Sequence, residues 1–438
     1  MFRSLFLGVL LLASQWTRSQ NFASYFTGNS EDAITSPKGG ICLMGGATED
    51  DFAMRWFLQQ ADGGDILVLR TSGSDGYNDY LYSTLGVNVN SVESIVYSNP
   101  SPTQKAYVLE RIERAEGIWF AGGDQWNYIS SWRNTAFDSL INLKIQQKKI
   151  VIGGTSAGMA IQGKYYFSAQ NGTITSQEAL ANPYNPKVKV DSISFLKNKF
   201  LEEVITDTHF DNPDRKGRLV VFLARINMDY QVAAKAISCD EYTAVCIDTN
   251  GIARVFGGDP QYDDNAYFVQ VNCENENVLP EVCLESIPLT WNHQNSALKV
   301  YQIKGTSTGN NTFDLSNWKI GDGGNWKNWS VNNGIFYEEN GALPNCFLGL
   351  QNETKTFEIQ LFPNPFQDQF TVRLETTLND QTQFLIYDNI GCRIPLVELE
   401  RRSKEVDFKL SNLKSGVYYL VIKNGNFENR MKIHFNQK

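Results

Sequence analysis

The sequence has few of the residues from which metal centres and membrane spans are built. Its 438 residues include three histidines, and none of its seven cysteines forms a Cys-x-x-Cys pair, so neither a zinc site nor any other metal or cofactor is expected. Its N-terminal apolar run is far shorter than the roughly 20 residues of a spanning helix, and no later segment could cross a bilayer. The net charge is −9 and no predicted helix carries a basic stripe, which argues against nucleic acid as a partner.

The first residues have the pattern of a secretory signal peptide. Arg3 is followed by an apolar stretch from Leu5 to Ala13, and Thr17-Arg18-Ser19 places small residues before a cleavage site at Gln20. We therefore expect residues 1–19 to be removed and the protein to mature outside the cytoplasm. Disulfides form in that environment, and Cys273 and Cys283, which bracket a short loop, are the expected pair.

Between Gly39 and Val271 short β-branched runs alternate with helical patterns. Alternating units of this length predict an α/β fold, in which a parallel sheet is covered by helices on both faces. Thr48 is expected to cap the first helix. The predicted strands cover 41–44, 65–69, 94–97, 117–121 and 148–152, and the predicted helices cover 77–85, 103–115 and 134–147.

Glycine pairs follow three of these strands. Ligands bind parallel sheets at the carboxyl ends of strands, so we expect Gly45-Gly46, Gly122-Gly123 and Gly153-Gly154 to share one rim. The last pair opens Gly154-Thr155-Ser156-Ala157-Gly158, which fits Gly-x-Ser-x-Gly between a strand and a helix predicted to start at Ala157. This turn would expose the Ser156 hydroxyl beside the free N–H of Ala157, as a nucleophile requires. The alternative is a glycine-rich turn with a solvated serine.

A serine nucleophile needs a base and an acid that orients the base. His434 lies in the C-terminal block and His293 lies outside the α/β region, which leaves His209, at the end of a predicted strand reaching the same rim. Asp240 and Glu241 open a strongly β-prone run, and either could accept a hydrogen bond from the histidine. Periodicity does not choose between them.

The loop after the strand ending at Ala121 offers further groups to a substrate. Glycines after a strand let backbone N–H groups approach a ligand, so Gly122 or Gly123 is expected to complete an oxyanion hole with Ala157. Gln125 can offer its amide to substrate. The alternative is an ordinary loop in which Asp124 caps the next helix.

Beyond about residue 272 the composition changes. A β-rich extension spans 272–356, where Trp318, Trp326 and Trp329 are expected to pack in a small β region rather than form a sugar-binding platform. Residues 357–438 contain strands separated by turns without helices, which predicts a β-sandwich.

Four motifs follow one another along the α/β region. They are Phe120-Ala121-Gly122-Gly123-Asp124-Gln125, Gly153-Gly154-Thr155-Ser156-Ala157-Gly158, Asp207-Thr208-His209-Phe210 and Asp240-Glu241-Tyr242-Thr243-Ala244. In this order they resemble the signatures of cyanophycinases and related serine peptidases. The resemblance covers residues 39–271 and implies a fold like class I glutamine amidotransferase domains, with a flavodoxin-like sheet and a serine in place of the nucleophilic cysteine. It implies Ser156 as nucleophile, His209 as base, Glu241 as orienting acid, and Gln125 and Asp207 as substrate contacts.

The resemblance is incomplete where the family binds its substrate. The family has a glutamine before the histidine and three spaced arginines after it. Here Thr208 precedes the histidine and Pro213 takes the place of the first arginine, while Arg215 and Arg218 fit the second and third. We therefore expect hydrolysis of a peptide or isopeptide bond of β-aspartyl type, next to an acidic residue, more than hydrolysis of cyanophycin.

The C-terminal block contains four short segments of a recognisable pattern. They are Pro363-Asn364-Pro365, Tyr387-Asp388-Asn389-Ile390-Gly391, Leu413 with Gly416-Val417-Tyr418, and Lys432-Ile433. With these segments, residues 357–438 resemble the C-terminal sorting domain of the type IX secretion system of Bacteroidetes. This resemblance implies export to the outer membrane, the cell surface or the medium, with the secretion machinery as a partner.

The expected protein is thus a signal peptide (1–19), a catalytic α/β domain (20–271), a β-rich extension (272–356) and a sorting β-sandwich (357–438). The leading function is a secreted serine hydrolase without a cofactor, and a homodimer is a possible assembly. One alternative is a catalytically inactive surface-binding homologue, which the altered arginine run favours. Another is an esterase of α/β-hydrolase type, which the order of residues disfavours because Glu241 follows His209.

Overall fold

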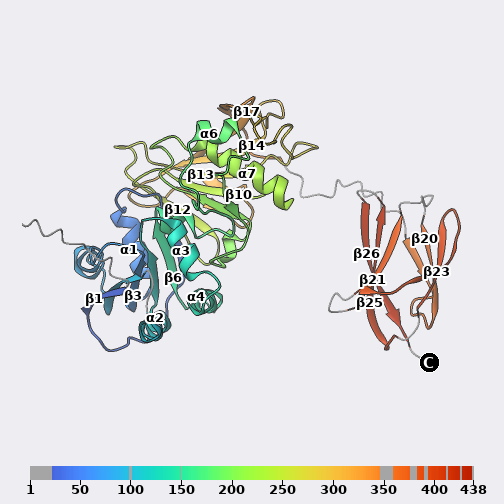
Figure 1. Cartoon of the computed structure of the whole chain (residues 1–438), viewed down its shortest axis with the longest axis horizontal. Coiled ribbons are helices and arrows are strands. Elements are labelled where there is room, and N and C mark those ends of the chain that lie inside the picture. The colour runs from blue at the N-terminus through green and yellow to red at the C-terminus, as the bar shows by residue number, and fades with distance from the viewer. Residues whose placement is uncertain are drawn as a thin grey trace, which may run out of the picture. The chain divides into compact units, whose positions relative to one another are not determined.

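The computed structural model describes residues 22–97, 101–147, 149–345, 359–374, 382–388, 393–410, 413–424 and 427–436. The chain divides into two compact units, Met1–Asn345 and Cys346–Lys438 (Figure 1). The predicted signal peptide lies outside the described residues. Within the described part of the chain, no helix is long and apolar enough to cross a membrane.

A ten-stranded sheet forms one half of the first unit. Its five central strands, from β4 to β2, run parallel, and the strands on both sides are antiparallel. The central strands are buried along nearly their whole length, as expected for parallel strands covered on both faces. In spatial order the strands are β1 (Phe22–Gly28), β4 (Ser91–Tyr97), β3 (Asp65–Arg70), β5 (Gly117–Phe120), β6 (Val151–Thr155), β2 (Gly40–Met44), β11 (Ala244–Ile247), β12 (Ile252–Phe256), β15 (Thr312–Asp314) and β16 (Gly321–Asp322).

Helices pack on both faces of this sheet, which confirms the predicted α/β fold. Helix α1 (Asp51–Gln60) packs in one apolar cluster, and α2 (Pro102–Arg114), α3 (Gln125–Trp132) and α4 (Ala136–Gln146) pack in another. The segment 77–85, predicted to be helical, contains a short π-helix, η1 (Tyr80–Thr84). Thr48 does not cap α1. The Asp50 carboxylate accepts from Ala53 N at 2.8 Å, because the helix begins later than predicted.

A second, six-stranded sheet was not predicted. Only β10 and β9 pair in parallel in it, and β9 is the strand that precedes His209, so this histidine does not come from the parallel sheet. Helix α7 (Lys216–Tyr230) covers one face of the second sheet (Figure 1). In order the strands are β18 (Ile335–Asn340), β17 (Gly324–Asn332), β14 (Leu298–Lys304), β13 (Asn265–Val271), β10 (Lys235–Cys239) and β9 (Val204–Asp207).

The other face of the second sheet packs against the first. Along β10, Ala236 lies in the cluster under α7, whereas Ile237 and Cys239 lie in the cluster that contains Leu43 and Val245 of the ten-stranded sheet. Side chains of a strand alternate between faces, so one strand contributes to both layers. Strands from the predicted extension complete both sheets, and the segment to Asn345 therefore belongs to the first compact unit.

Smaller elements connect these layers. They are α5 (Ala157–Ala160), β7 (Tyr166–Phe167), α6 (Ser176–Ala181), β8 (Val190–Asp191) and the 3₁₀-helix η2 (Lys199–Leu201). Trp318 and Trp329 are buried and Trp326 packs against the core, as expected for structural tryptophans.

The predicted disulfide is wrong. Cys283 is a free, buried thiol, whereas Cys273 is disulfide-bonded to a different cysteine. Closeness in sequence did not predict the disulfide partner of Cys273, because Cys283 packs instead in the apolar cluster beneath α7.

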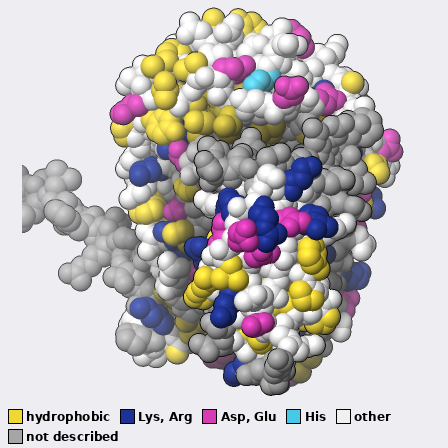
Figure 2. All heavy atoms as spheres, turned by 90° about the vertical axis from the view of Figure 1, so that its right-hand side faces the viewer, with side chains coloured by type: hydrophobic (Ala, Val, Ile, Leu, Met, Phe, Trp, Pro, Cys, Tyr) yellow, Lys and Arg dark blue, Asp and Glu magenta, His cyan; other side chains and the backbone are white. Residues whose placement is uncertain are grey.

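The second unit is a β-sandwich of two four-stranded sheets, as predicted. One sheet has the order β19 (Ile359–Phe362), β20 (Gln369–Leu374), β24 (Glu405–Lys409), β23 (Val397–Arg401), and the other β22 (Arg393–Ile394), β21 (Gln383–Tyr387), β25 (Gly416–Asn424), β26 (Phe427–Phe435). Its surface mixes charges of both signs. Arg402, for example, pairs with Glu400, Glu405 and Asp407. Figure 2 shows such mixing of acidic and basic side chains on the face that it draws.

Candidate active site

Ser156 occupies a strained turn between β6 and α5. Its φ of 51° and ψ of −114° lie outside the regions that ordinary residues prefer. A Cβ atom on Gly158 would lie 2.0 Å from the carbonyl oxygen of Phe120, and one on Gly154 would lie 2.5 Å from the backbone of Gly158. Neither of these two glycines of the motif could carry a side chain, because other backbone atoms lie too close to each. Helix α5 begins at Ala157 as predicted but is a single turn, so the N–H groups near Ser156 act individually and not as the end of a long helix dipole.

His209 lies between Ser156 and Glu241. The distance from its Nε2 to Ser156 Oγ is 2.8 Å, and the distance from its Nδ1 to Glu241 Oε1 is 2.6 Å. Asn212 Nδ2 donates to the other carboxylate oxygen of Glu241 at 3.3 Å. Of the two acids that the sequence left open, Glu241 thus contacts the histidine, while Asp240 is buried and accepts from Asn265.

The end of β2 connects all three segments. The Met44 carbonyl accepts from Ser156 N at 3.1 Å, and the Gly45 carbonyl accepts from His209 N at 2.9 Å. The Gly46 carbonyl accepts from Tyr242 N, next to Glu241, at 3.1 Å. A Cβ atom on Gly46 would lie 2.4 Å from the His209 ring. Sequence reasoning placed the two glycines at the rim but did not anticipate that their backbone holds the other segments together.

Burial and hydrogen bonds shift the ionisation of the acids in opposite directions. For Glu241, burial opposes ionisation, but hydrogen bonds from His209 and Asn212 outweigh it and lower the pKa of the carboxyl. For Asp240, burial dominates over the hydrogen bonds from Asn265 and raises the pKa to about 7. One carboxylate is thus stabilised in its charged form beside the imidazole, while its neighbour is not.

A cavity of about 190 Å³ lies beside Ser156 and His209. Gly123, Gln125 and Ala157 line it, and a Cβ atom on Gly122 would lie 3.6 Å from Ser156 Cβ, so every residue expected near an oxyanion is close to the serine. The Gln125 amide is partly engaged, because its Nε2 donates to the Phe167 carbonyl at 3.3 Å. Asp124 caps α3, its carboxylate accepting from Trp126 N at 2.9 Å, so the predicted helix cap is confirmed.

Of the charged side chains that line this cavity, two form an ion pair with each other and a third does not form one. Asp207 and Arg218 form a buried ion pair, with Arg218 Nε donating to Asp207 Oδ2 at 2.9 Å and a second bond between Arg218 NH2 and Asp207 Oδ1. Arg215 donates from NH1 to the Thr208 carbonyl at 2.8 Å, but its buried Nε has no partner and it forms no ion pair within the described ranges. Burial and then the charge of Arg218 lower the pKa of Arg215 to about 10, so it remains a cation at neutral pH.

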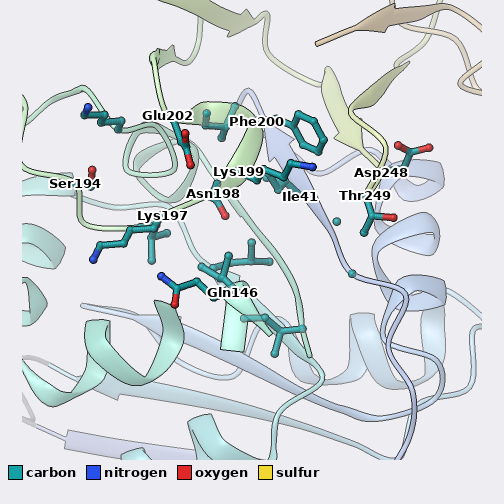
Figure 3. Close-up of a pocket in the computed structure, with 18 residues that line it drawn as sticks. Ile41, Gln146, Ser194, Lys197, Asn198, Lys199, Phe200, Glu202, Asp248 and Thr249 are labelled. Atoms are coloured by element: carbon teal, nitrogen blue, oxygen red, sulfur yellow. The ribbon is translucent and has the colours of Figure 1, made fainter. Parts of the chain in front are cut away.

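A larger cavity, of about 530 Å³, lies at the opposite edge of the parallel strands (Figure 3). Ile41 comes from the start of β2, and Asp248 and Thr249 follow β11. None of the predicted site residues lines it. Among the residues that the structure describes, no group of three or more His, Cys, Asp or Glu side chains could hold a metal ion.

Two family models match the chain. Residues 71–252 match peptidase family S51, and residues 360–436 match the secretion system C-terminal sorting domain. The cyanophycinase of Synechococcus elongatus is 25% identical over 229 residues, which is 50% of this chain and 66% of that protein. That of Trichormus variabilis is 26% identical over 154 residues, which is 35% of this chain and 46% of the relative. The chain thus spans less than two thirds of the length of these relatives.

Solved structures of peptidases also align with the chain. A peptidase from an acI-B1 Actinobacterium aligns with a TM-score of 0.39 at 14% identity, covering 63% of this chain and 96% of that one. A putative peptidase E from Listeria monocytogenes aligns with a TM-score of 0.34 at 14% identity, covering 50% and 99%.

Both resemblances found in the sequence are confirmed by the family matches. The first unit contains a mixed α/β domain, most of which matches the peptidase family model. More specifically, residues 71–252 are similar to peptidase family S51 and to cyanophycinases, and residues 360–436 match a type IX secretion sorting domain. The sorting domain indicates secretion to the cell surface or beyond.

Proposed function

We propose that this protein is a serine peptidase that hydrolyses peptide or isopeptide bonds with Ser156, His209 and Glu241. The observation that carries the proposal is the position of the His209 ring, hydrogen-bonded to the serine on one side and to the carboxylate on the other. This is the arrangement that activates a serine hydroxyl and stabilises the imidazolium formed during attack.

Each group has one role in the proposed mechanism. Ser156 Oγ attacks the carbonyl carbon while its proton moves to His209 Nε2, and Glu241 accepts from Nδ1–H and holds the tautomer. The N–H of Ala157 and that of Gly122 or Gly123 donate to the oxyanion. His209 then gives the proton to the leaving amine. Water attacks the acyl-enzyme while His209 takes its proton, and His209 returns that proton to Ser156 Oγ as the bond to the acyl group breaks and the acid product leaves.

We further propose that the acyl side of the substrate carries a carboxylate, as an aspartyl or β-aspartyl residue does. Asp207 and Arg218 pair with each other, so Arg215 is the arginine of the cavity that has no direct ion pair, although Glu241 and Asp211 act on it from a distance. A partly buried cation without a direct ion pair favours an anionic ligand. In this proposal Asp207 acts by holding Arg218, and Gln125 lies at the edge of the substrate cavity.

A fluorophosphonate probe tests the nucleophile, because it reacts with activated serines alone. We expect the full chain to be labelled at Ser156, and Ser156→Ala to lose both the label and all turnover of aspartyl dipeptides while its circular dichroism is unchanged. Ser139→Ala, on the exposed side of α4, is the matched control and should behave as wild type. Folded wild-type protein that is not labelled would instead support the inactive binding homologue.

Substrate panels separate peptidase from esterase. We expect α- and β-aspartyl dipeptides to be cleaved faster than asparaginyl dipeptides, and p-nitrophenyl esters with apolar acyl chains to be poor substrates. The reverse order would favour the esterase.

A further inference from the structure

We infer that Cys42 and Cys246 are the two halves of a cross-strand disulfide that forms when the chain folds under oxidising conditions. Their Sγ atoms are 3.6 Å apart, and neither side chain is exposed. The two residues are directly opposite each other in the antiparallel pair of β2 and β11. This inference is independent of the proposed hydrolysis.

The hydrogen-bond pattern of the ladder places this pair at a favourable position. Gly45 N donates to the carbonyl of Thr243, which the same register sets opposite it. Hydrogen-bonded and non-hydrogen-bonded pairs alternate along antiparallel strands, so Cys42 and Cys246, three positions further along the ladder, form a non-hydrogen-bonded pair. Such pairs have Cα atoms about 4.5 Å apart, within the range of about 4.4–6.8 Å that a disulfide spans. Bond formation therefore needs rotation of two side chains and little movement of backbone.

The chemistry needs an external oxidant, for which a small disulfide such as glutathione disulfide is sufficient. One cysteine thiolate attacks it and releases a glutathione thiolate, and the second cysteine then attacks the mixed disulfide and releases another. The two cysteine sulfurs lose two electrons, the oxidant gains them, and the two protons go to the released thiolates. A secreted chain meets such oxidants during folding.

Burial of the two thiols in the folded protein makes their oxidation faster during folding than after it. Burial, with a hydrogen bond to Cys42, raises the pKa of the Cys246 thiol, so the reactive thiolate is scarce in the folded state. We therefore expect oxidation during folding to be much faster than oxidation of the folded reduced protein. Cys239, a third buried thiol, contacts the Leu43 carbonyl through its sulfur at 3.9 Å and belongs to β10, so it lacks a directly opposed partner cysteine.

The test is refolding of the full chain with and without oxidant. Protein refolded in glutathione buffer should give, in a non-reduced digest, a linked peptide pair containing Cys42 and Cys246 that is about 2 Da lighter than the two thiol peptides. Its thermal midpoint should rise by about 5 °C relative to protein refolded with reductant.

Cysteine variants separate this bond from the disulfide of Cys273. Cys246→Ala and Cys42→Ala should each lose the linked pair and most of the midpoint shift on oxidation, while Cys283→Ala, which removes a buried free thiol elsewhere, should keep both. The two alanine variants check one another should either fold poorly. Oxidised, folded wild-type protein with free thiols at both positions, or with Cys239 as the linked partner, would overturn the inference.

Discussion

The two sheets of the first unit contribute different parts of the candidate site. The ten-stranded sheet carries Ser156 and the backbone N–H groups around it, at positions fixed by neighbours in the same sheet. The six-stranded sheet carries His209 after β9, and Glu241 lies in the turn that leads from β10 to the first sheet. The position of the proposed nucleophile thus depends on local geometry, whereas that of the proposed base depends on how two sheets pack.

This difference indicates where the candidate site is sensitive. The strain at Ser156 is maintained by glycines within a few residues and by β5. The contact of His209 with Ser156 also requires the end of β2, whose carbonyls accept from all three segments. Changes to the second sheet or to the β2 end should therefore impair proton transfer while the nucleophile turn remains intact.

Glu241→Gln should have the largest effect. A glutamine can donate to His209 Nδ1 and so favour the wrong tautomer, as well as removing the charge that stabilises the imidazolium. We expect kcat for an aspartyl dipeptide to fall by about 10²–10⁴-fold, with the thermal midpoint nearly unchanged. Steady-state kinetics and a thermal melt measure both.

The matched control is Glu203→Gln, an exposed carboxylate just before β9 that pairs with Lys235. It should leave turnover within about twofold of wild type, because exposed ion pairs contribute little. Wild-type turnover in Glu241→Gln would contradict the role of this acid.

Gly46→Ala tests the connection between the sheets. The added methyl group would lie 2.4 Å from the His209 ring, on a backbone with φ of 127°. We expect a loss of about 10²-fold in turnover, because misplacing a catalytic group by about 1 Å has that effect. The measurements are kcat and the rate of fluorophosphonate labelling.

Gly86→Ala is the control for the effect of backbone strain alone. Gly86 has φ of 68°, and a Cβ atom on it would meet nothing within 4 Å. This variant should lose about 1 kcal/mol of stability and keep its turnover. If both variants lost turnover equally, contact with His209 would not be the cause.

Much of the first sheet could be predicted from sequence because its signals are local. Buried β-branched runs, intervening helical patterns and glycines at strand ends all lie within short windows, and the Gly-x-Ser-x-Gly spacing follows from backbone contacts inside one turn. The nearness of His209 and Glu241 followed from family motifs, not from periodicity, which left Asp240 and Glu241 equivalent.

The second sheet could not be predicted in the same way. Its strand β14 pairs with β13, and β17 pairs with β14, both antiparallel and from segments well separated in the sequence, and register across such distances leaves no pattern in a short window. The α1 cap at Asp50 and the free thiol of Cys283 could not be predicted for the same reason. Where a helix starts and which cysteines pair both depend on tertiary packing. The ion pair of Asp207 and Arg218 could not be predicted either, because Asp207 ends a strand and Arg218 lies in a helix.

Arg215→Gln should alter selectivity more than chemistry. Loss of a charged hydrogen-bond donor to a substrate carboxylate typically costs about 1.5–3 kcal/mol, which corresponds to about 10–10²-fold in kcat/KM. We expect this loss for aspartyl dipeptides and little change for asparaginyl ones, measured as a ratio of kcat/KM values. Arg225→Gln, which removes an arginine paired with Asp229 on the same helix, should leave the ratio unchanged. An unchanged ratio in Arg215→Gln would remove the argument for an acidic substrate.

Asp240→Asn should have the smallest effect. Asp240 lies in the turn between β10 and β11, where the chain passes from the second sheet to the first. Burial, together with the nearby charge of Asp211, raises the pKa of Asp240 to about 7 in the folded protein against the opposing effects of Asn265 and Lys216. An unfolded aspartate has a pKa of about 3.9, so between pH 4 and pH 7 the folded state holds a proton that the unfolded state has lost. Stability must therefore fall as pH rises through this window.

The neutral variant lacks this pH dependence, and its side-chain oxygen can still accept from Asn265. Wild-type protein should lose about 1 kcal/mol of unfolding free energy between pH 6 and pH 8 relative to Asp240→Asn, and little below pH 4. All nine tryptophans precede residue 330, so fluorescence during denaturant unfolding follows the first unit alone. Parallel curves for the two proteins across this range would mean that Asp240 ionises normally in the fold. The turn between β10 and β11 would then be more open to water than its burial implies.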